Sequence, residues 1–212
     1  MRRLLAIVLT AALAAALALP GLALAQQQGK FAYTELQQRQ PAETASGKIE
    51  VLEFFWYGCP HCYNLEPTLE TWLKKLPPDV QFVRVPAILS ERWQYDAQIF
   101  YTFDAMNLLP KLHRPFFDAI HRDGLRTDNQ QALAEWLKRQ GVDDKRFFDT
   151  MKSMGVDTKL RRAAHLTLAY RINGTPAMAV AGRYTIGAEQ ARSQQGMVDT
   201  VDYLVGTLRK QK

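Results

Sequence analysis

The apolar positions of the chain follow strand patterns near its start and its end and helical patterns between them. Residues 49–55 form the strongest strand, because from its third residue on this run is apolar on both faces apart from Glu53. A helical pattern follows over residues 59–76, where Pro67 is expected to kink the helix. Residues 80–85 then repeat the strand pattern. The order strand, helix, strand predicts a β–α–β unit with parallel strands.

Residues 90–172 carry apolar positions at the three- and four-residue spacing of helices. The helices predicted in this stretch span residues 91–109, 115–121, 130–140, 145–154 and 158–171. The residues expected to cap the last three are Asp128 or Asn129, Asp143 or Asp144, and Asp157. A long helical block therefore interrupts the strands.

Strands return near the end of the chain. Residues 177–180 and 183–186 predict a hairpin that turns at Ala181-Gly182. Residues 188–208 predict a closing helix, and residues 31–36 a short edge strand.

The strand-bearing segments on either side of the helical block are expected to join into one sheet, so the predicted fold class is α/β. Residues 26–87 and 173–212 then form one domain, and residues 88–172 form an inserted all-helical subdomain. Hydrophobic residues make up 47% of the 212 residues. A chain of this size and composition can bury a packed core without disulfide staples.

The first 25 residues have the pattern of a cleavable export signal. Two arginines precede an alanine-rich apolar run at residues 4–19, which Pro20 and Gly21 end. Ala23-Leu24-Ala25 fits the small-x-small cleavage pattern, so we expect cleavage before Gln26. An uncleaved membrane anchor is the alternative, which the helix break and the cleavage pattern disfavour. The signal predicts an oxidising compartment, most simply a bacterial periplasm.

The charge of the chain gives little indication of a partner. The formal net charge is +6, and two of these charges belong to the export signal. The remaining basic residues are spread along the chain, as on solvated helix faces. Without a binding motif or a basic stripe interleaved with aromatic residues, we expect no nucleic-acid role. No other stretch of the sequence is apolar enough to cross a bilayer.

Cys59 and Cys62 are the only cysteines, and they stand together as Cys59-Pro60-His61-Cys62. The pattern places Cys59 at a helix N-terminus, with Pro60 at the first helical position. Backbone N–H groups there favour a thiolate, which is the reactive form in disulfide exchange. We therefore expect Cys59 to be the exposed nucleophile and Cys62 the more buried resolving thiol.

A zinc site is the alternative for this cysteine pair, and it would need two more ligands. The histidines outside the motif lack suitable spacing to the pair, so we expect neither a metal nor a catalytic role for them; they are His113, His121 and His165.

Three segments together resemble the DsbA family of periplasmic thiol:disulfide oxidoreductases. They are Val51-Leu52-Glu53-Phe54-Phe55, Cys59-Pro60-His61-Cys62 and Gly174-Thr175-Pro176-Ala177-Met178. The resemblance implies a thioredoxin fold with a helical domain inserted after the second strand of the β–α–β unit. It also implies a low cysteine pKa and an oxidising disulfide.

The resemblance assigns roles to further residues. His61 is expected to favour the Cys59 thiolate through its positive charge. Glu53 is expected to be a buried acid that moves a proton to or from Cys62, unless it faces the surface. Thr175-Pro176, after Gly174, is expected to be a cis bond that presents the Thr175 backbone to an extended substrate strand. A plain trans loop is the alternative.

Aromatic residues beside the motif have two possible roles. Trp56, Tyr57 and Tyr63 could line an apolar groove for unfolded chains, or they could pack in the core. The aromatic residues within helical patterns are predicted to be core, namely Trp72, Trp93, Phe100, Phe103, Trp136, Phe147 and Phe148.

The sequence thus predicts a periplasmic, monomeric enzyme that donates a Cys59–Cys62 disulfide to newly exported polypeptides. A DsbB-type, quinone-linked membrane protein is the expected reoxidant, and no metal or organic cofactor is needed. A disulfide isomerase or reductase on the same fold and a redox-silent peptide-binding chaperone are the alternatives. A glutathione-binding isomerase of the hydroxychromene carboxylate type shares the architecture but lacks the cysteine pair.

Overall fold

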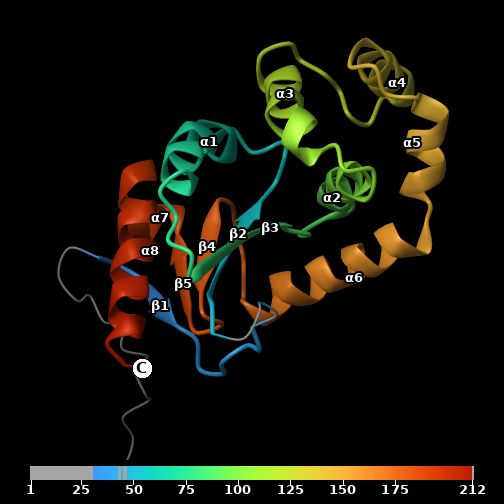
Figure 1. Cartoon of the computed structure of the whole chain (residues 1–212). Coiled ribbons are helices and arrows are strands. Elements are labelled where there is room, and N and C mark those ends of the chain that lie inside the picture. The colour runs from blue at the N-terminus through green and yellow to red at the C-terminus, as the bar shows by residue number, and fades with distance from the viewer. Residues whose placement is uncertain (1–30, 43, 45–46, 212) are drawn as a thin grey trace, which may run out of the picture.

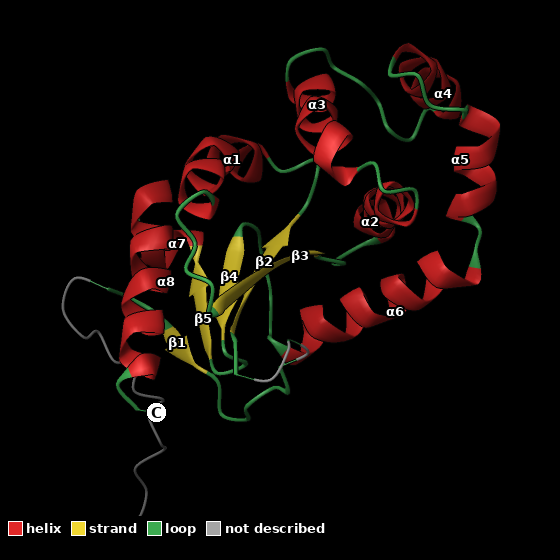
Figure 2. Ribbon diagram, in the orientation of Figure 1, coloured by secondary structure: helices red, strands yellow, loops and turns green. Residues whose placement is uncertain are grey.

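The computed structural model describes residues 31–42, 44 and 47–211. In this part of the chain a five-stranded sheet has the order β1-β5-β4-β2-β3 (Figure 2). The strands are β1 (Thr34–Glu35), β2 (Ile49–Phe55), β3 (Val80–Pro86), β4 (Ala177–Val180) and β5 (Tyr184–Gly187). The strongest predicted strand, β2, therefore lies inside the sheet, and both ends of the chain contribute strands, as predicted.

Helices cover both faces of the sheet (Figure 1). The helices are α1 (Pro60–Leu73), α2 (Glu91–Ala105), α3 (Leu109–His121), α4 (Gln130–Arg139), α5 (Asp144–Met151), α6 (Met154–Ala169), α7 (Ala188–Ala191) and α8 (Gln194–Arg209). Helices α1, α7 and α8 lie on one side of the sheet, and α2 to α6 lie on the other. The predicted subdomain boundaries fall in the loops that precede α2 and follow α6, and the division into two domains stays a prediction.

The alternation of side chains along β2 explains the two layers. Leu52 and Phe54 belong to the core that includes α2 to α6, whereas Ile49 and Val51 pack with the buried residues of α1 and α8. Glu53 lies two residues after Val51 in the strand, so its side chain projects to the same face, on which α1 lies.

Strands β2 and β3 are parallel, as predicted, and their register places Glu53 directly opposite Arg84. Neighbouring residues in a parallel pair project to the same face, so this acid and this base lie side by side beneath α1. Strand β4 pairs with the other edge of β2 in an antiparallel sense.

The predicted hairpin turn is confirmed. Ala181 and Gly182 both have positive φ, of 53° and 66°, and the Arg183 N–H donates to the Val180 carbonyl at 3.0 Å. The register pairs Val180 with Tyr184, so three residues join the strands and β5 begins one residue later than predicted. The predicted caps Asn129 and Asp143 are confirmed as well, since their side chains accept hydrogen bonds from Ala132 N–H and Arg146 N–H.

Several predicted boundaries were wrong. The helix predicted over 91–109 ends at Ala105, because Asn107 adopts a left-handed conformation with φ of 57°. The next helix begins at Leu109 and not at residue 115, since a proline at its second position fits the first turn. The helix predicted from residue 158 starts at Met154, where Ser153 and not Asp157 is the cap.

The ends of the sheet differ from prediction too. The strand predicted over 31–36 pairs only at Thr34–Glu35. The closing helix predicted over 188–208 is broken between α7 and α8 by Arg192, which has φ of 61°, and Ser193 caps α8. A left-handed residue cannot continue a right-handed helix.

The predicted aromatic core is largely observed. Five of the seven rings are buried and two, Trp93 and Phe148, are half-buried against the same core. The predicted export signal lies outside the described residues. Within the described part, no helix combines the length and the apolar character that a membrane span requires.

Candidate active site

The cysteine pair occupies the first turn of α1. Cys59 is the N-cap with extended backbone, and the Cys62 N–H donates to its Sγ at 3.3 Å. Pro60 follows at the first helical position, where a missing N–H leaves no hydrogen bond unmade. Both cysteines are free thiols in this structure.

The predicted exposure of Cys59 was wrong. Cys59 is 6% exposed and Cys62 is fully buried. The loop before β4 lies against the Cys59 sulfur, which is 3.3 Å from the carbonyl oxygen of Thr175 and can donate to it only when it is protonated. The Thr175–Pro176 bond is cis. A segment 116 residues further along the chain therefore completes the surroundings of the nucleophile, and Gly174 beside it is exposed.

The two sulfurs have opposite electrostatic surroundings. The hydrogen bond from the Cys62 thiol is the largest influence on Cys59, and it lowers the pKa of Cys59 against the opposing effect of burial. The Thr175 side chain and the backbone N–H groups of Cys62 and His61 add to this effect, so the pKa of Cys59 is about 5. Burial raises the pKa of Cys62 well above its usual value. Cys59 is thus the thiolate at neutral pH.

His61 is exposed on the first turn of α1. Its backbone N–H is among the groups that lower the pKa of Cys59, and the predicted effect of its side-chain charge stays a prediction. A helix N-terminus offers such N–H groups whatever the side chain.

Glu53 lies in the centre of the sheet with no exposed surface. Burial raises its pKa to about 8, even though the Arg84 guanidinium opposes the shift. The Arg84 Nε atom is 3.1 Å from a Glu53 oxygen, but neither oxygen of Glu53 accepts an aligned hydrogen bond from a described residue. A carboxyl in this position is mostly protonated near neutral pH.

Sequence reasoning missed three polar residues that are linked to Glu53. Arg84 of β3 lies between the carboxylates of Glu53 and Glu66, and its Nη2 donates to Glu66 at 3.0 and 3.2 Å. His113 of α3 contacts Glu66 from the other side, at 3.4 Å. The parallel register of β2 and β3 could have indicated Arg84, whereas no sequence signal placed His113 there.

The aromatic residues beside the motif divide between core and surface. Tyr57 is buried, and its hydroxyl lies 2.9 Å from His113 Nδ1, so the predicted groove does not include it. Trp56 is half-buried and stacks on Trp93 at 4.6 Å. Tyr63 stacks on the ring of His121 at 4.8 Å.

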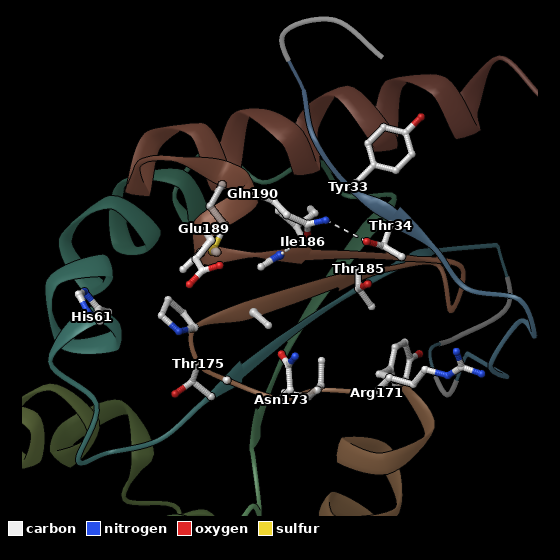
Figure 3. A pocket seen from close by; sticks show the side chains of 18 of the residues that line it. Tyr33, Thr34, His61, Arg171, Asn173, Thr175, Thr185, Ile186, Glu189 and Gln190 are labelled. Atoms are coloured by element: carbon white, nitrogen blue, oxygen red, sulfur yellow. Dashed lines mark hydrogen bonds between the residues drawn. The ribbon is translucent and has the colours of Figure 1, made fainter. Parts of the chain in front are cut away.

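A groove of about 1540 Å³ opens beside the cysteine motif (Figure 3). His61 borders it at one end, and the segment 170–177 forms one wall. The remainder comes from residues in and beside β1, β5 and α7, together with Leu65 of α1 and the start of α8. The groove therefore begins at His61 of the cysteine motif and runs along a surface that includes the Thr175 loop. Among the described residues no group of three or more acidic, histidine or cysteine side chains could hold a metal ion.

The comparisons with known proteins agree with this geometry. Residues 79–196 match the model of the DSBA-like thioredoxin domain family. The thiol:disulfide interchange protein DsbA of Azotobacter vinelandii is 41% identical over 173 residues, which cover 82% of this chain and 80% of that protein. DsbA of Bordetella parapertussis is 40% identical over 186 residues, covering 87% and 88%.

Solved structures give the same result. The crystal structure of Pseudomonas aeruginosa DsbA has a TM-score of 0.80 at 37% identity, covering 84% of this chain and 93% of that one. The oxidoreductase DsbA from Xylella fastidiosa has a TM-score of 0.77 at 31% identity, covering 84% and 95%. The chain therefore belongs to the DSBA-like thioredoxin domain family and is a thiol:disulfide oxidoreductase.

Proposed function

We propose that this protein is a periplasmic oxidase that transfers its Cys59–Cys62 disulfide to newly exported polypeptides. The observation that supports this most is the contrast between the two sulfurs. Cys59 sits at the start of α1 with a pKa of about 5, and Cys62 is a buried thiol whose pKa is raised. Stabilising the Cys59 thiolate stabilises the reduced protein, which makes its disulfide a stronger oxidant.

The reaction proceeds through a mixed disulfide. A substrate thiolate attacks the Cys59 sulfur, the Cys59–Cys62 bond breaks, and Cys62 leaves with the electron pair. A second substrate thiolate then attacks the substrate sulfur of the mixed disulfide, and Cys59 leaves as a thiolate. The substrate loses two electrons and gains a disulfide, while the protein ends as a dithiol. The low pKa of Cys59 makes it the better leaving group in the second step.

Glu53 is proposed to supply a proton to Cys62. The departing Cys62 sulfur is fully buried, so its negative charge is costly unless a proton reaches it. Glu53 lies beneath α1 and, with a pKa of about 8, holds a proton near neutral pH. It then accepts a proton again when the dithiol is reoxidised.

The groove beside the motif is proposed to bind the substrate chain as an extended strand. Thr175 and Pro176 line this groove directly beside the Cys59 sulfur, and Gly174 borders them. Trp56 and Tyr63 stay candidates for contacts at its rim. Extended peptides pair through their backbone, which suits substrates of many sequences.

The redox unit is the cysteine pair itself, so the proposed cycle needs no organic cofactor or metal. A DsbB-type, quinone-linked membrane protein is the proposed reoxidant. Two observations support the proposed periplasmic location. The first 25 residues have the pattern of an export signal that is cleaved off, and the chain is similar to DsbA proteins.

The test is disulfide transfer from the oxidised protein to a reduced, unfolded polypeptide with two cysteines. We expect rapid transfer by the native protein and none by Cys59→Ser or Cys62→Ser, because neither variant can form the intramolecular disulfide that is transferred. The reduction potential, measured against glutathione, is expected to be oxidising. A strongly reducing potential would instead support a reductase. Absence of transfer by the native protein, with binding of the unfolded polypeptide retained in Cys59→Ser, would support a redox-silent chaperone.

A further inference from the structure

A row of buried polar side chains links α3 to the centre of the sheet. It runs from the Tyr57 hydroxyl through His113 and Glu66 to Arg84 and ends at Glu53. The successive contacts measure 2.9, 3.4, 3.0 and 3.1 Å. The side chains of Glu66 and Glu53 are 2% and 0% exposed. The row therefore holds two buried carboxyl groups with one guanidinium between them.

The donors and acceptors in this row can be oriented in only one way when Glu66 is ionised. A carboxylate only accepts, so His113 Nε2 must carry the hydrogen that points to Glu66. Burial lowers the pKa of His113, so its ring is neutral and Nδ1 has no hydrogen. The Tyr57 hydroxyl keeps its proton because burial raises its pKa, and it donates to Nδ1.

The two carboxyl groups receive unequal support. Glu66 accepts from Arg84 Nη2 and also from His113. Burial opposes its ionisation, but these two partners outweigh burial, and the pKa of Glu66 is lowered. Glu53 has the Arg84 contact alone, and that contact is not aligned as a hydrogen bond. Two carboxylates that share one cation in a low dielectric do not both ionise easily.

We propose that His113 is a positioning residue that places the shared proton on Glu53 and keeps it off Glu66. By donating to Glu66 it makes that carboxylate the preferred anion, and Arg84 is then largely neutralised by Glu66. Glu53 consequently keeps the proton that the buried Cys62 sulfur needs. This inference rests on the proposed role of Glu53, and it assigns a function to a histidine for which the sequence predicted none.

Other charged groups around the row do not replace His113. Glu70 of α1 is exposed, and Asp96 of α2 already accepts hydrogen bonds from Trp56 and Thr127. The Cys59 thiolate, on α1, raises the pKa of Glu53 only as the smallest of its influences. A pocket of about 700 Å³ is lined by Arg84, Glu66 and His113, so the row has contact with solvent on the side away from Glu53.

The experiment is an NMR titration of ¹³C-labelled glutamate carboxyl groups in the reduced, full protein, with Glu53→Gln used to assign the Glu53 signal. In His113→Leu, Glu66 loses one of its two donors, so it competes less well for the charge of Arg84, which then favours Glu53 more. We expect Glu53 to titrate at a pH lower by about one unit or more, a tenfold or larger change in its proton affinity, and Glu66 to titrate at a higher pH.

His113→Gln keeps a donor toward Glu66 and is expected to restore most of the native titration. Tyr57→Phe keeps the packing but frees Nδ1, and it should shift Glu53 in the same direction by less. His165→Leu, the same change at an exposed histidine of α6, is the matched control and should shift nothing.

An unchanged Glu53 titration in His113→Leu would overturn the proposal, as would a shift of the same size in His165→Leu. If His113→Leu does not fold, the Glu53 titrations of Tyr57→Phe and His113→Gln are compared with that of the native protein. An unchanged Glu53 titration in Tyr57→Phe would then overturn the proposal. The titration reports protonation and needs no substrate. A failure of the oxidase function would therefore be seen in the transfer assay and not here.

Discussion

At the scale of single residues, the site combines two shifts of opposite sign within one helical turn and the strand beneath it. Cys59 is stabilised as an anion by donors that point at its sulfur, whereas Glu53 is kept neutral by the absence of such donors. Burial has opposite consequences for the two groups. At Cys59 the hydrogen-bond donors outweigh the penalty of burial, whereas at Glu53 burial outweighs the attraction of Arg84.

Glu53 should make the protein less stable as pH rises. Its pKa is raised from 4.5 to about 8 in the folded state, so the folded state binds more protons than the unfolded state between these values. Unfolding free energy therefore falls with pH across this window, by at most about a tenfold change in the folding equilibrium per pH unit.

Glu53→Gln removes this titration, so its stability relative to the native protein should increase between pH 4.5 and about 8. Denaturant unfolding of both proteins, in the oxidised form, at several pH values measures this difference. If the unfolding free energies of both proteins depended on pH in the same way, the raised pKa of Glu53 would be contradicted. Glu35→Gln, at an exposed acid of β1, provides the control.

At the scale of elements, the β4–β5 hairpin holds the N-terminal segment in place. The Gly182 carbonyl accepts from the Gln40 N–H at 2.7 Å, and Arg183 O accepts from Leu36 N–H at 2.8 Å. These bonds tie the segment around β1 to the sheet, and that segment lines one side of the groove. The turn therefore shapes the proposed binding surface from a distance.

Gly182→Ala should destabilise the protein strongly, because a Cβ there would lie 2.0 Å from the Gln40 carbonyl oxygen. Gly141→Ala is a matched control, since Gly141 has a similar φ of 74° but nothing within 4 Å of the added atom. We expect a loss of about 1 kcal/mol for Gly141→Ala and about 2 kcal/mol or more beyond that for Gly182→Ala.

Thermal or denaturant unfolding of the two variants provides the comparison. Equal losses would show that the backbone conformation alone matters and that the contact with Gln40 does not.

At the scale of the whole molecule, the redox reaction and the folding equilibrium are linked. Only the reduced form has a Cys59 thiol to titrate, and its pKa is lowered from 9.0 to about 5 in the folded state. A lowered pKa contributes stability above the unfolded value and loses it as pH falls through the folded value. The contribution therefore grows between about pH 5 and 9.

The stability of the reduced form relative to the oxidised form should accordingly increase from pH 5 to pH 9. Glu53 is present in both forms, so most of its own effect cancels in this difference. Denaturant unfolding of the reduced and oxidised forms at matched pH measures this difference in stability. A difference that does not vary with pH would mean that Cys59 is not stabilised as a thiolate in the folded protein.

Much of the fold followed from local patterns. The alternation in β2, the turn at Ala181-Gly182 and the caps of α4 and α5 depend on neighbouring residues, so they could be predicted. The early start of α6 was missed because Gly155, a poor helix former, predicted a break, whereas the helix runs through it from the Ser153 cap. The break at Arg192 was missed because the helical pattern of apolar positions continues past it, although Ser193 caps the next helix.

The candidate site shows the same division. Spacing and capping are local properties, so the two cysteines one turn apart at a helix start could be predicted from the amino-acid sequence alone. The contact of Thr175 with Cys59, and the cluster of Arg84, Glu66 and His113 beside Glu53, arise only when distant segments pack together. Charges depend on burial and on contacts between segments far apart in the chain, and these exist only once the sheet and its helices are packed.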